Sequence, residues 1–204
     1  VDEQGNIRRA DIMGALIARD ILKRVPGTTI LYDLRSSRAF KEEIEAGGGK
    51  AVQCRVGHAF IKREMRKHDA AFAAELAGHF YFKDFWRADS GMLAALHAIA
   101  ALLEDGRSLS TILQPFNRYF LSGEINTKVN DQQGALAAKR SHFAASTEGC
   151  EFDNLDGLTV SASKWWFNVR PSNTEPLLRL NVEAHDQRLL DEKTSQVLAI
   201  INNQ

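Results

Sequence analysis

Arginine, hydroxyl and amide side chains are concentrated in one loop, Asn168–Pro176, which lies between two runs typical of β-strands. Arg170 can present a planar fork of N–H donors to phosphate oxygens, and Ser172 and Thr174 add hydroxyl donors. Asn173 tolerates the left-handed backbone that turns successive N–H groups toward an anion. The loop therefore indicates a phosphate site. The alternative is a tight turn whose polar side chains bond only to their own backbone.

The order of residues in this loop is Arg-Pro-Ser-Asn-Thr-Glu-Pro, followed directly by Leu-Leu-Arg-Leu-Asn-Val-Glu. Together the two runs resemble the phosphate-binding loop in domain four of the α-D-phosphohexomutases of the phosphomannomutase/phosphoglucomutase type. In that family the loop holds the phosphate of the sugar that is not reacting. The resemblance implies that Arg170, Ser172, Asn173 and Thr174 bind phosphate. Arg179, on the strand that leaves the loop, is implied to add a second positive charge.

A second loop, Ala74-Glu75-Leu76-Ala77-Gly78-His79, resembles the sugar-recognition loop of the same family, which reads Gly-Glu-Met-Ser-Gly-His. Alanine stands here in the places of the first glycine and the serine. Glu75 is implied to accept hydrogen bonds from two adjacent sugar hydroxyls, because a carboxylate offers about four lone-pair sites and no donor. His79 is implied to contact the substrate as well. The alternatives are a salt bridge for Glu75 and a buried structural role for His79.

Two further segments have counterparts in the family. Arg55-Val56-Gly57-His58 resembles its Thr-Gly-His loop and opens a predicted helix, whose N-terminus favours anions. The resemblance implies Gly57 and His58 as substrate contacts, with His58 also aiding proton transfer. Arg35, directly after a predicted strand, occupies the position of a basic residue that faces the family's active cleft. A capping histidine and a solvated arginine are the alternatives.

The spacing of apolar residues predicts the domain that positions these loops, from residue 8 to residue 117. Because predicted helices and strands alternate with short loops, we expect a layered α/β domain. The strands are expected at Thr29–Leu34, Ala51–Cys54, Ala70–Ala74 and Phe80–Phe82. The helices are expected at Asp11–Arg24, around Phe40 and Ile44, around Ile61 and Met65, from Met92 to Leu103, and from Leu109 until Pro115 ends the helix. The buried face of the fourth helix is predicted to consist of Met92, Leu93, Leu96, Ile99, Ala100 and Leu103.

Residues 118–204 are expected to form a second, smaller domain of the α+β class with an antiparallel sheet. Its strands are predicted at Glu124–Val129, Leu158–Ser161, Trp165–Val169 and Leu177–Val182, and its helices near Gln133–Phe143 and Gln187–Ile201. The phosphate loop then lies between two neighbouring strands of this sheet.

Charge and cysteine content exclude several classes of protein. The 26 basic and 26 acidic residues give a formal net charge of zero and form no long block of one sign, so nucleic acid and anionic membranes are poor partners. No apolar run approaches the roughly 20 residues of a membrane helix, and the start of the chain lacks the pattern of a secretory signal. We therefore expect a cytoplasmic protein. Cys54 and Cys150 show no spacing typical of a disulfide framework or a zinc site.

Two further motifs of the family are missing, namely the phosphoserine loop and the Asp-x-Asp-x-Asp metal loop. The opening Val1–Gly5 resembles the segment that follows the metal loop, so residues 1–7 are expected to be the tail of the preceding domain. The resemblance implies a parent enzyme that interconverts hexose 1- and 6-phosphates through a phosphoserine and a hexose 1,6-bisphosphate. Magnesium would be bound outside this chain, which holds no predicted metal ligand. The chain alone is expected not to turn over substrate.

Several identities remain open at this stage. Mannose and glucose phosphates are both candidate substrates, because the implied contacts are to phosphate and to hydroxyls other than the one that distinguishes the two sugars. A phosphoglucosamine mutase is a second enzyme candidate, although that branch usually has glycine at the position of Asn173. A standalone phosphosugar-binding module without catalysis is the alternative from another class.

Overall fold

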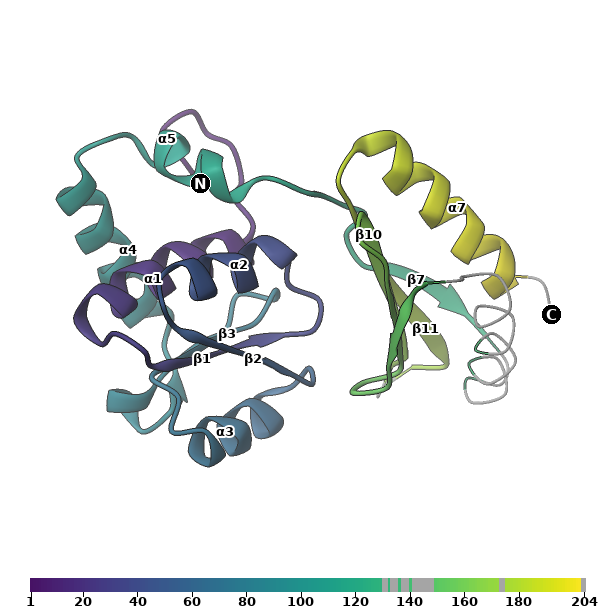
Figure 1. Cartoon of the computed structure of the whole chain (residues 1–204), viewed down its shortest axis with the longest axis horizontal. Helices are drawn as coiled ribbons and strands as arrows, with labels where there is room; N and C mark the ends of the chain where they lie inside the picture. Colours follow the sequence, from purple (N-terminus) through teal and green to yellow (C-terminus); the bar gives the residue numbers. More distant parts are fainter. Residues whose placement is uncertain (130–131, 133–135, 137–139, 141–148, 173–174, 203–204) are drawn as a thin grey trace. The chain divides into compact units, whose positions relative to one another are not determined.

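The computed structural model describes the chain except for residues 130–131, 133–135, 137–139, 141–148, 173–174 and 203–204 (Figure 1). The chain divides into two compact units, Val1–Arg118 and Tyr119–Gln204. Within the described residues, no helix has both the length and the apolar character needed to cross a membrane.

Unit 1 is a layered α/β domain, as predicted. Its helices are α1 (Ala10–Arg24), α2 (Arg38–Ala46), α3 (His58–Lys67), α4 (Gly91–Asp105) and α5 (Leu109–Leu113), with 3-10 turns η1 (Lys83–Phe85) and η2 (Gln114–Phe116). Its strands are β1 (Thr29–Asp33), β2 (Lys50–Cys54), β3 (Phe72–Ala74), β4 (Phe80–Phe82) and β5 (Ala88–Asp89), in the order β2-β1-β3-β4-β5. Strands β1, β2 and β3 are parallel, whereas β4 and β5 are added antiparallel. Helices α1 and α2 cover one face of the sheet and α3 covers the other (Figure 1).

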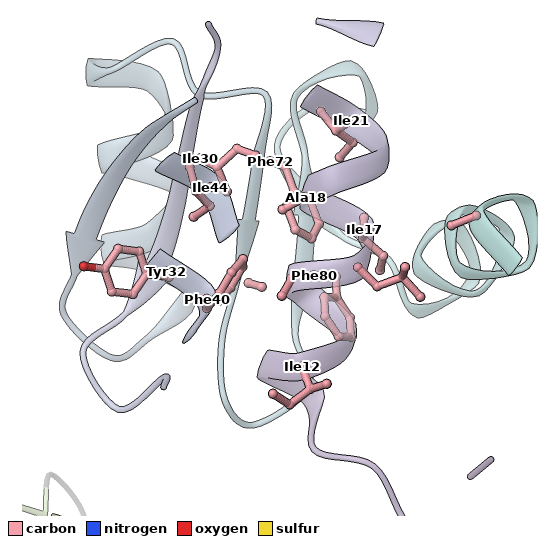
Figure 2. Close-up of a cluster of buried hydrophobic side chains, with 14 of the residues drawn as sticks. Ile12, Ile17, Ala18, Ile21, Ile30, Tyr32, Phe40, Ile44, Phe72 and Phe80 are labelled. Atoms are coloured by element: carbon pink, nitrogen blue, oxygen red, sulfur yellow. The ribbon is translucent and has the colours of Figure 1, made fainter. Parts of the chain in front are cut away.

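The main core of unit 1 lies between α1 and the sheet (Figure 2). Its apolar residues from α1, α2 and the strands are buried, as their helical and strand spacing predicts. Gly14 lies at the closest approach, where an added Cβ would come within 3.0 Å of the Cβ of Ala74 and 3.2 Å of the ring of Phe40. Ser37 caps α2 by accepting a hydrogen bond from the N–H of Ala39 at 3.2 Å. The labelled core residues are Ile12, Ile17, Ala18, Ile21, Ile30, Tyr32, Phe40, Ile44, Phe72 and Phe80.

The predicted buried face of α4 is wrong. Ala94 and Ala101 are the buried residues of this helix, and Leu93 and Leu102 pack partly buried against the core. The helix is apolar on nearly all sides, so apolar spacing cannot choose which side faces inward. Five of the six residues predicted to be buried are exposed, namely Met92, Leu96, Ile99, Ala100 and Leu103.

Unit 2 contains an antiparallel sheet with a helix packed against one face, in agreement with the predicted fold class (Figure 1). Its elements are β6 (Phe120–Leu121), β7 (Ile125–Lys128), β8 (Glu151–Asp153), β9 (Leu158–Ser161), β10 (Trp165–Pro171), β11 (Leu177–Ala184) and α7 (Gln187–Asn202). The strand order is β6-β11-β10-β9-β8, and β7 also pairs with β11. Most of the helix predicted near Gln133–Phe143 lies outside the described residues.

The two cysteines form no disulfide. Cys54 is buried at the end of β2 and Cys150 is half-buried. Burial and the nearby Glu64 carboxylate raise the pKa of the Cys54 thiol to about 12. A thiol with so high a pKa is protonated at neutral pH and acts as a small apolar side chain.

Candidate functional site

The loops that follow three parallel strands bring predicted sugar-binding residues together. Strands β1, β2 and β3 run parallel, so the residues after their last positions meet at one edge of the sheet. Arg35 follows β1, Gly57 follows β2 and Glu75 follows β3 directly. With Asp33, the last residue of β1, they form a cluster that we call the carboxylate edge.

Glu75 is the centre of the carboxylate edge and is only 3% exposed. Its Oε1 accepts a hydrogen bond from the hydroxyl of Tyr81 at 2.6 Å, and its Oε2 accepts one from the N–H of Gly57 at 3.2 Å. A guanidinium nitrogen of Arg35 lies 3.9 Å from Oε2. Burial raises the pKa of Tyr81, and the hydrogen bond to Glu75 raises it further. The Glu75 carboxylate is therefore held in one orientation by partners on two other segments.

Asp33 is fully buried and binds both Arg35 and the backbone of the Glu75 loop. Its Oδ2 accepts hydrogen bonds from Nη2 of Arg35 at 2.6 Å and from the N–H of Leu76 at 2.9 Å. Its Oδ1 accepts the N–H of Arg35 at 2.8 Å. Our sequence interpretation did not single out Asp33 as a site residue. A charged residue inside an otherwise apolar strand was the available signal, because buried carboxylates are rare unless paired.

Gly57 has the backbone conformation that its position requires. Its φ of 123° lies in the region that L side chains rarely adopt, and it is the N-cap of α3. His58 is the exposed first residue of that helix, and no described residue forms a hydrogen bond or ion pair with it. His58 therefore directly follows Gly57 of the carboxylate edge, and among the described residues no hydrogen bond or ion pair joins its side chain to Glu75.

His79 lies at the other end of the loop that begins with Glu75. The loop is closed by a hydrogen bond from the N–H of Glu75 to the carbonyl of His79, at 2.9 Å. Nδ1 of the imidazole is 2.6 Å from Oδ2 of Asp89, whose other oxygen accepts the N–H of Phe80 at 2.9 Å. The His79 side chain is 54% exposed, so the alternative of a buried structural histidine does not apply. Its ring is oriented by Asp89 and reaches solvent.

The predicted phosphate-binding arginines lie on neighbouring strands of unit 2. Arg170 on β10 and Arg179 on β11 are direct partners across the antiparallel ladder. Two like charges in this position repel each other. The carboxylate of Glu124 bridges them, with Oε2 at 3.0 Å from Nη2 of Arg170 and Oε1 at 2.8 Å from Nη1 of Arg179. Nη2 of Arg179 also donates to Oγ of Ser172 at 3.2 Å.

We call Glu124, Arg170, Ser172 and Arg179 the arginine hairpin. Arg170 is 5% exposed and Ser172 is 6% exposed, so both are held within the fold. Asn173 and Thr174 lie outside the described residues. Glu124 was missed by the sequence interpretation, because its pairing with Arg170 spans 46 positions and leaves no local spacing pattern.

Two neighbouring segments brace the arginine hairpin. The side-chain amide of Gln132 donates to the carbonyl oxygens of Glu175 at 2.8 Å and Leu177 at 2.9 Å. On another side, Gly157 has a φ of 76°, and an added Cβ would lie 2.3 Å from the carbonyl oxygen of Val169 and 2.7 Å from Cα of Arg170. Only glycine fits there, which places the Gly157 turn directly against the backbone that carries Arg170.

Residues of β10 and β11 at alternate positions continue the polar face from the arginine hairpin. Nε1 of Trp166 donates to Oε1 of Glu183 at 2.7 Å, and Nδ2 of Asn168 donates to Oγ1 of Thr159 at 3.0 Å. Asn168 is fully buried and Glu183 is 1% exposed. Buried polar side chains with hydrogen-bond partners fix their neighbours in place. The opposite face, with Phe167 and Val169, belongs to the apolar core under α7.

Magnesium, which the family resemblance implies, has no matching site among the residues that the structure describes. Within the described ranges, no three His, Cys, Asp or Glu side chains gather closely enough to hold a metal ion. The carboxylates of Asp33 and Glu75 instead accept hydrogen bonds from Arg35, Tyr81 and backbone N–H groups.

Comparison with known proteins identifies the family. The family model described as phosphoglucomutase/phosphomannomutase, alpha/beta/alpha domain III, matches residues 9–119. The model for the C-terminal domain of the same proteins matches residues 124–200. The chain therefore belongs to the phosphoglucomutase/phosphomannomutase family and covers its third domain and its C-terminal domain.

Individual relatives agree with this assignment. A phosphomannomutase of Methanocaldococcus jannaschii is 45% identical over 201 residues, which are 98% of this chain and 44% of the relative. A phosphoglucomutase/phosphomannomutase family protein from Burkholderia thailandensis has a TM-score of 0.82 at 26% identity, over 97% of this chain and 42% of that chain. An N-acetylphosphoglucosamine mutase of Aspergillus fumigatus, solved with GlcNAc-6P and magnesium, shares the fold with a TM-score of 0.70 at 13% identity, over 98% of this chain and 48% of that one. The chain thus spans less than half the length of these relatives.

Proposed function

We propose that this chain is the sugar- and phosphate-recognising part of a phosphohexomutase that interconverts hexose 1-phosphates and hexose 6-phosphates. The observation that carries the proposal is the arginine hairpin, in which Arg170 and Arg179 are partners on neighbouring strands and both bind one carboxylate, that of Glu124. The family membership and the carboxylate edge support the same function.

The arginine hairpin is proposed to bind the phosphate that does not react. Nε of Arg179 is buried and forms no hydrogen bond with any described residue. Guanidinium groups match phosphate oxygens in planar geometry, and a hydrogen bond to a charged partner is about twice as strong as a neutral one. A phosphate between Arg170 and Arg179 would supply an acceptor. Ser172 adds its hydroxyl, and Asn173 and Thr174 remain proposed contacts from the family motif.

The carboxylate edge is proposed to recognise the sugar. Tyr81 and Gly57 each donate to a different oxygen of Glu75, and a carboxylate has about four lone-pair sites. Two adjacent hydroxyls of a hexose can use the remaining sites. Arg35, Gly57 and His79 are proposed as further substrate contacts. Because Glu75 is already oriented, little rotamer entropy is lost when the sugar binds.

The complete reaction needs groups that this chain does not supply. In the proposed parent enzyme, a phosphoserine transfers its phosphoryl group to the hexose phosphate, which gives a hexose 1,6-bisphosphate. The bisphosphate turns over and returns its other phosphate to the serine. Magnesium in the parent would stabilise the transferred charge. This chain is proposed to position the sugar in both orientations and to be inactive alone.

His58 is proposed as a substrate contact that aids proton transfer to or from a sugar hydroxyl. It is exposed at the start of α3, next to Gly57, whose N–H already binds Glu75. The test is a His58→Ala substitution in a polypeptide that joins this chain to the phosphoserine and metal segments. Loss of kcat with unchanged KM is expected, whereas unchanged kinetics would remove His58 from the site.

The proposed phosphate site is tested by titrating this chain with mannose 1-phosphate, glucose 1-phosphate, unphosphorylated mannose and inorganic phosphate, followed by NMR. Arg170→Ala and Arg179→Ala are expected to weaken phosphosugar binding at least about 10-fold, because each removes a charged hydrogen bond. Arg188→Ala is the matched control, since Arg188 is an exposed arginine of α7 in the same unit. Equal binding by the Arg170→Ala and Arg188→Ala variants would refute the phosphate site.

A further inference from the structure

The outward face of α4 carries exposed apolar side chains along its whole length. Met92 is 79% exposed, Leu96 57%, Ile99 53% and Leu103 77%. Ala95 and Ala100 are also exposed. An ordinary surface helix presents charged and polar residues to solvent, so a face of this composition marks an interaction site.

The polar side chains of α4 are directed toward α1 and do not interrupt this face. Nδ1 of His97 lies 3.2 Å from Oδ2 of Asp20, and Asp105 lies 3.9 Å from Arg19. Glu104, at the last turn, pairs with Lys23 at 2.9 Å. We call the six outward residues Met92, Ala95, Leu96, Ile99, Ala100 and Leu103 the α4 stripe.

The α4 stripe has the spacing of a helix-pairing seam. Its large residues follow one another at intervals of four, three and four, which is the alternation of the apolar positions in paired helices. The stripe is also symmetric about its centre between His97 and Ala98. Reversal of the helix exchanges Met92 with Leu103, Leu96 with Ile99 and Ala95 with Ala100.

From this symmetry we propose that the α4 stripe is the interface of a homodimer in which α4 of two copies pack antiparallel about a two-fold axis. A two-fold interface requires one patch that is complementary to itself. In the proposed dimer, Leu96 of each copy contacts Ile99 of the other, and Met92 contacts Leu103. The two alanines allow the helices to approach closely.

The exposed area of the stripe reaches the minimum expected of a specific interface. The four large side chains expose about 500 Å² in one copy, so two copies would bury about 1,000 Å², the lower bound for a specific interface. The antiparallel arrangement also brings Glu104 of one copy to the first turn of the other helix, near Gly91. A carboxylate is stabilised at that end of a helix.

The composition of the stripe favours a second copy over a lipid surface. Helices that lie on membranes carry Lys and Arg beside their apolar face. Every exposed residue of α4 is apolar or glycine except Glu104, which is acidic. The stripe therefore lacks the basic residues that anionic lipid would attract.

The test is sedimentation velocity of this chain over a range of micromolar concentrations. The chain is expected to sediment as a dimer of twice its 22.7 kDa mass. Leu96→Lys should raise the dissociation constant at least about 10-fold, because it places two charges in the centre of the interface. Leu155→Lys is the control, since Leu155 is 37% exposed and lies in unit 2. Thermal unfolding of both variants would show that each remains folded.

Disulfide trapping tests the orientation. In a Cys150→Ser background, a mixture of Leu96→Cys and Ile99→Cys variants is expected to cross-link readily, and either variant alone only weakly. Efficient cross-linking of Leu96→Cys with itself would indicate parallel helices and overturn the proposal. A monomeric wild-type chain, or a dimer insensitive to Leu96→Lys, would overturn it as well.

Discussion

The carboxylate edge of unit 1 and the arginine hairpin of unit 2 both hold buried ionic groups, but they balance charge in different ways. In the carboxylate edge, Asp33 and Glu75 receive hydrogen bonds from Arg35, Tyr81 and backbone N–H groups, so each buried acceptor has several partners. In the arginine hairpin, two opposed guanidinium groups share one bridging carboxylate, Glu124.

This difference corresponds to the ligands that we propose. A sugar hydroxyl is neutral and needs an oriented acceptor, which the fully braced Glu75 provides. A phosphate is an anion and needs positively charged hydrogen-bond donors, which Arg170 and Arg179 offer from neighbouring strands. We therefore expect the carboxylate edge to contribute strongly to stability even without ligand, and the arginine hairpin to depend on anions.

The largest effect is expected from Asp33→Ala in the carboxylate edge. The substitution leaves the buried Arg35 guanidinium and the N–H of Leu76 without their shared acceptor, which should lower the free energy of unfolding by about 3–5 kcal/mol. Urea denaturation measures the change. Asp69→Ala is the control, because Asp69 forms only exposed ion pairs with Lys83 and Arg87 and should cost at most about 1 kcal/mol. Similar losses from both variants would contradict the comparison.

A smaller loss is expected from Gly157→Ala beside the arginine hairpin. The added Cβ overlaps the carbonyl of Val169 and Cα of Arg170, so the backbone must move at a cost of about 2–3 kcal/mol. Gly149→Ala measures the cost of positive φ, since Gly149 has a φ of 80° and no described residue lies within 4 Å of an added Cβ. That control should cost about 1 kcal/mol. Equal costs would show that close packing against Arg170 has no energetic role.

Tyr81→Phe tests how far Glu75 depends on one hydrogen bond, with an expected loss of about 1–2 kcal/mol at neutral pH. It should also change the pH dependence of stability. The pKa of Tyr81 is raised by burial and by Glu75, so the unfolded tyrosine ionises first as the pH rises above about 10. Stability is therefore retained below that pH and lost above it, by about 1.4 kcal/mol per pH unit for each such group.

Removal of the Tyr81 hydroxyl should make the loss of stability above pH 10 less steep by about 1.4 kcal/mol per pH unit, the contribution of one titrating group. Tyr32→Phe is the matched control, because burial and Glu45 raise the pKa of Tyr32 to about 12, whereas the hydroxyl that donates to Glu75 is that of Tyr81. Both variants should flatten the slope above pH 10, but only Tyr81→Phe should weaken sugar binding. If the free energy of unfolding fell as steeply above pH 10 in Tyr81→Phe as in the wild type, ionisation of Tyr81 would not cause the loss of stability.

The smallest effect is expected from Glu124→Gln in the arginine hairpin. Loss of the bridging charge should lower the free energy of unfolding by about 1 kcal/mol, since the Glu124 side chain is 24% exposed and the pair is partly screened. Millimolar phosphate or sulfate should restore more stability to this variant than to the wild type, because an anion replaces the carboxylate between the guanidiniums. Glu192→Gln is the control, because Glu192 lies on α7 of the same unit, has a side chain that is 47% exposed and pairs with Lys193. Equal anion effects in all three proteins would rule out the bridging role.

Much of the fold was predictable from apolar spacing and local stop signals. Helix α1, with Ile12, Ile17 and Ile21, and strand β1 occur where their patterns predict, because each has one clearly apolar surface to bury. The phosphate loop and the loop of Glu75 were recognisable because their residues are adjacent in the sequence. The prediction of the buried face of α4 was wrong, because a helix that is apolar on nearly all sides has no preferred inward side in its own sequence.

The sequence by itself determined the two domain types, the order of their elements and the family motifs, because these depend on local spacing and on adjacent residues. Only the tertiary structure decided that Tyr81 and Gly57 both hold Glu75 and that Glu124 joins Arg170 to Arg179. It also decided that the charges of α4 pair with α1, which leaves the α4 stripe exposed. These contacts join residues far apart in the chain, so their energies depend on which surfaces the packed core brings together.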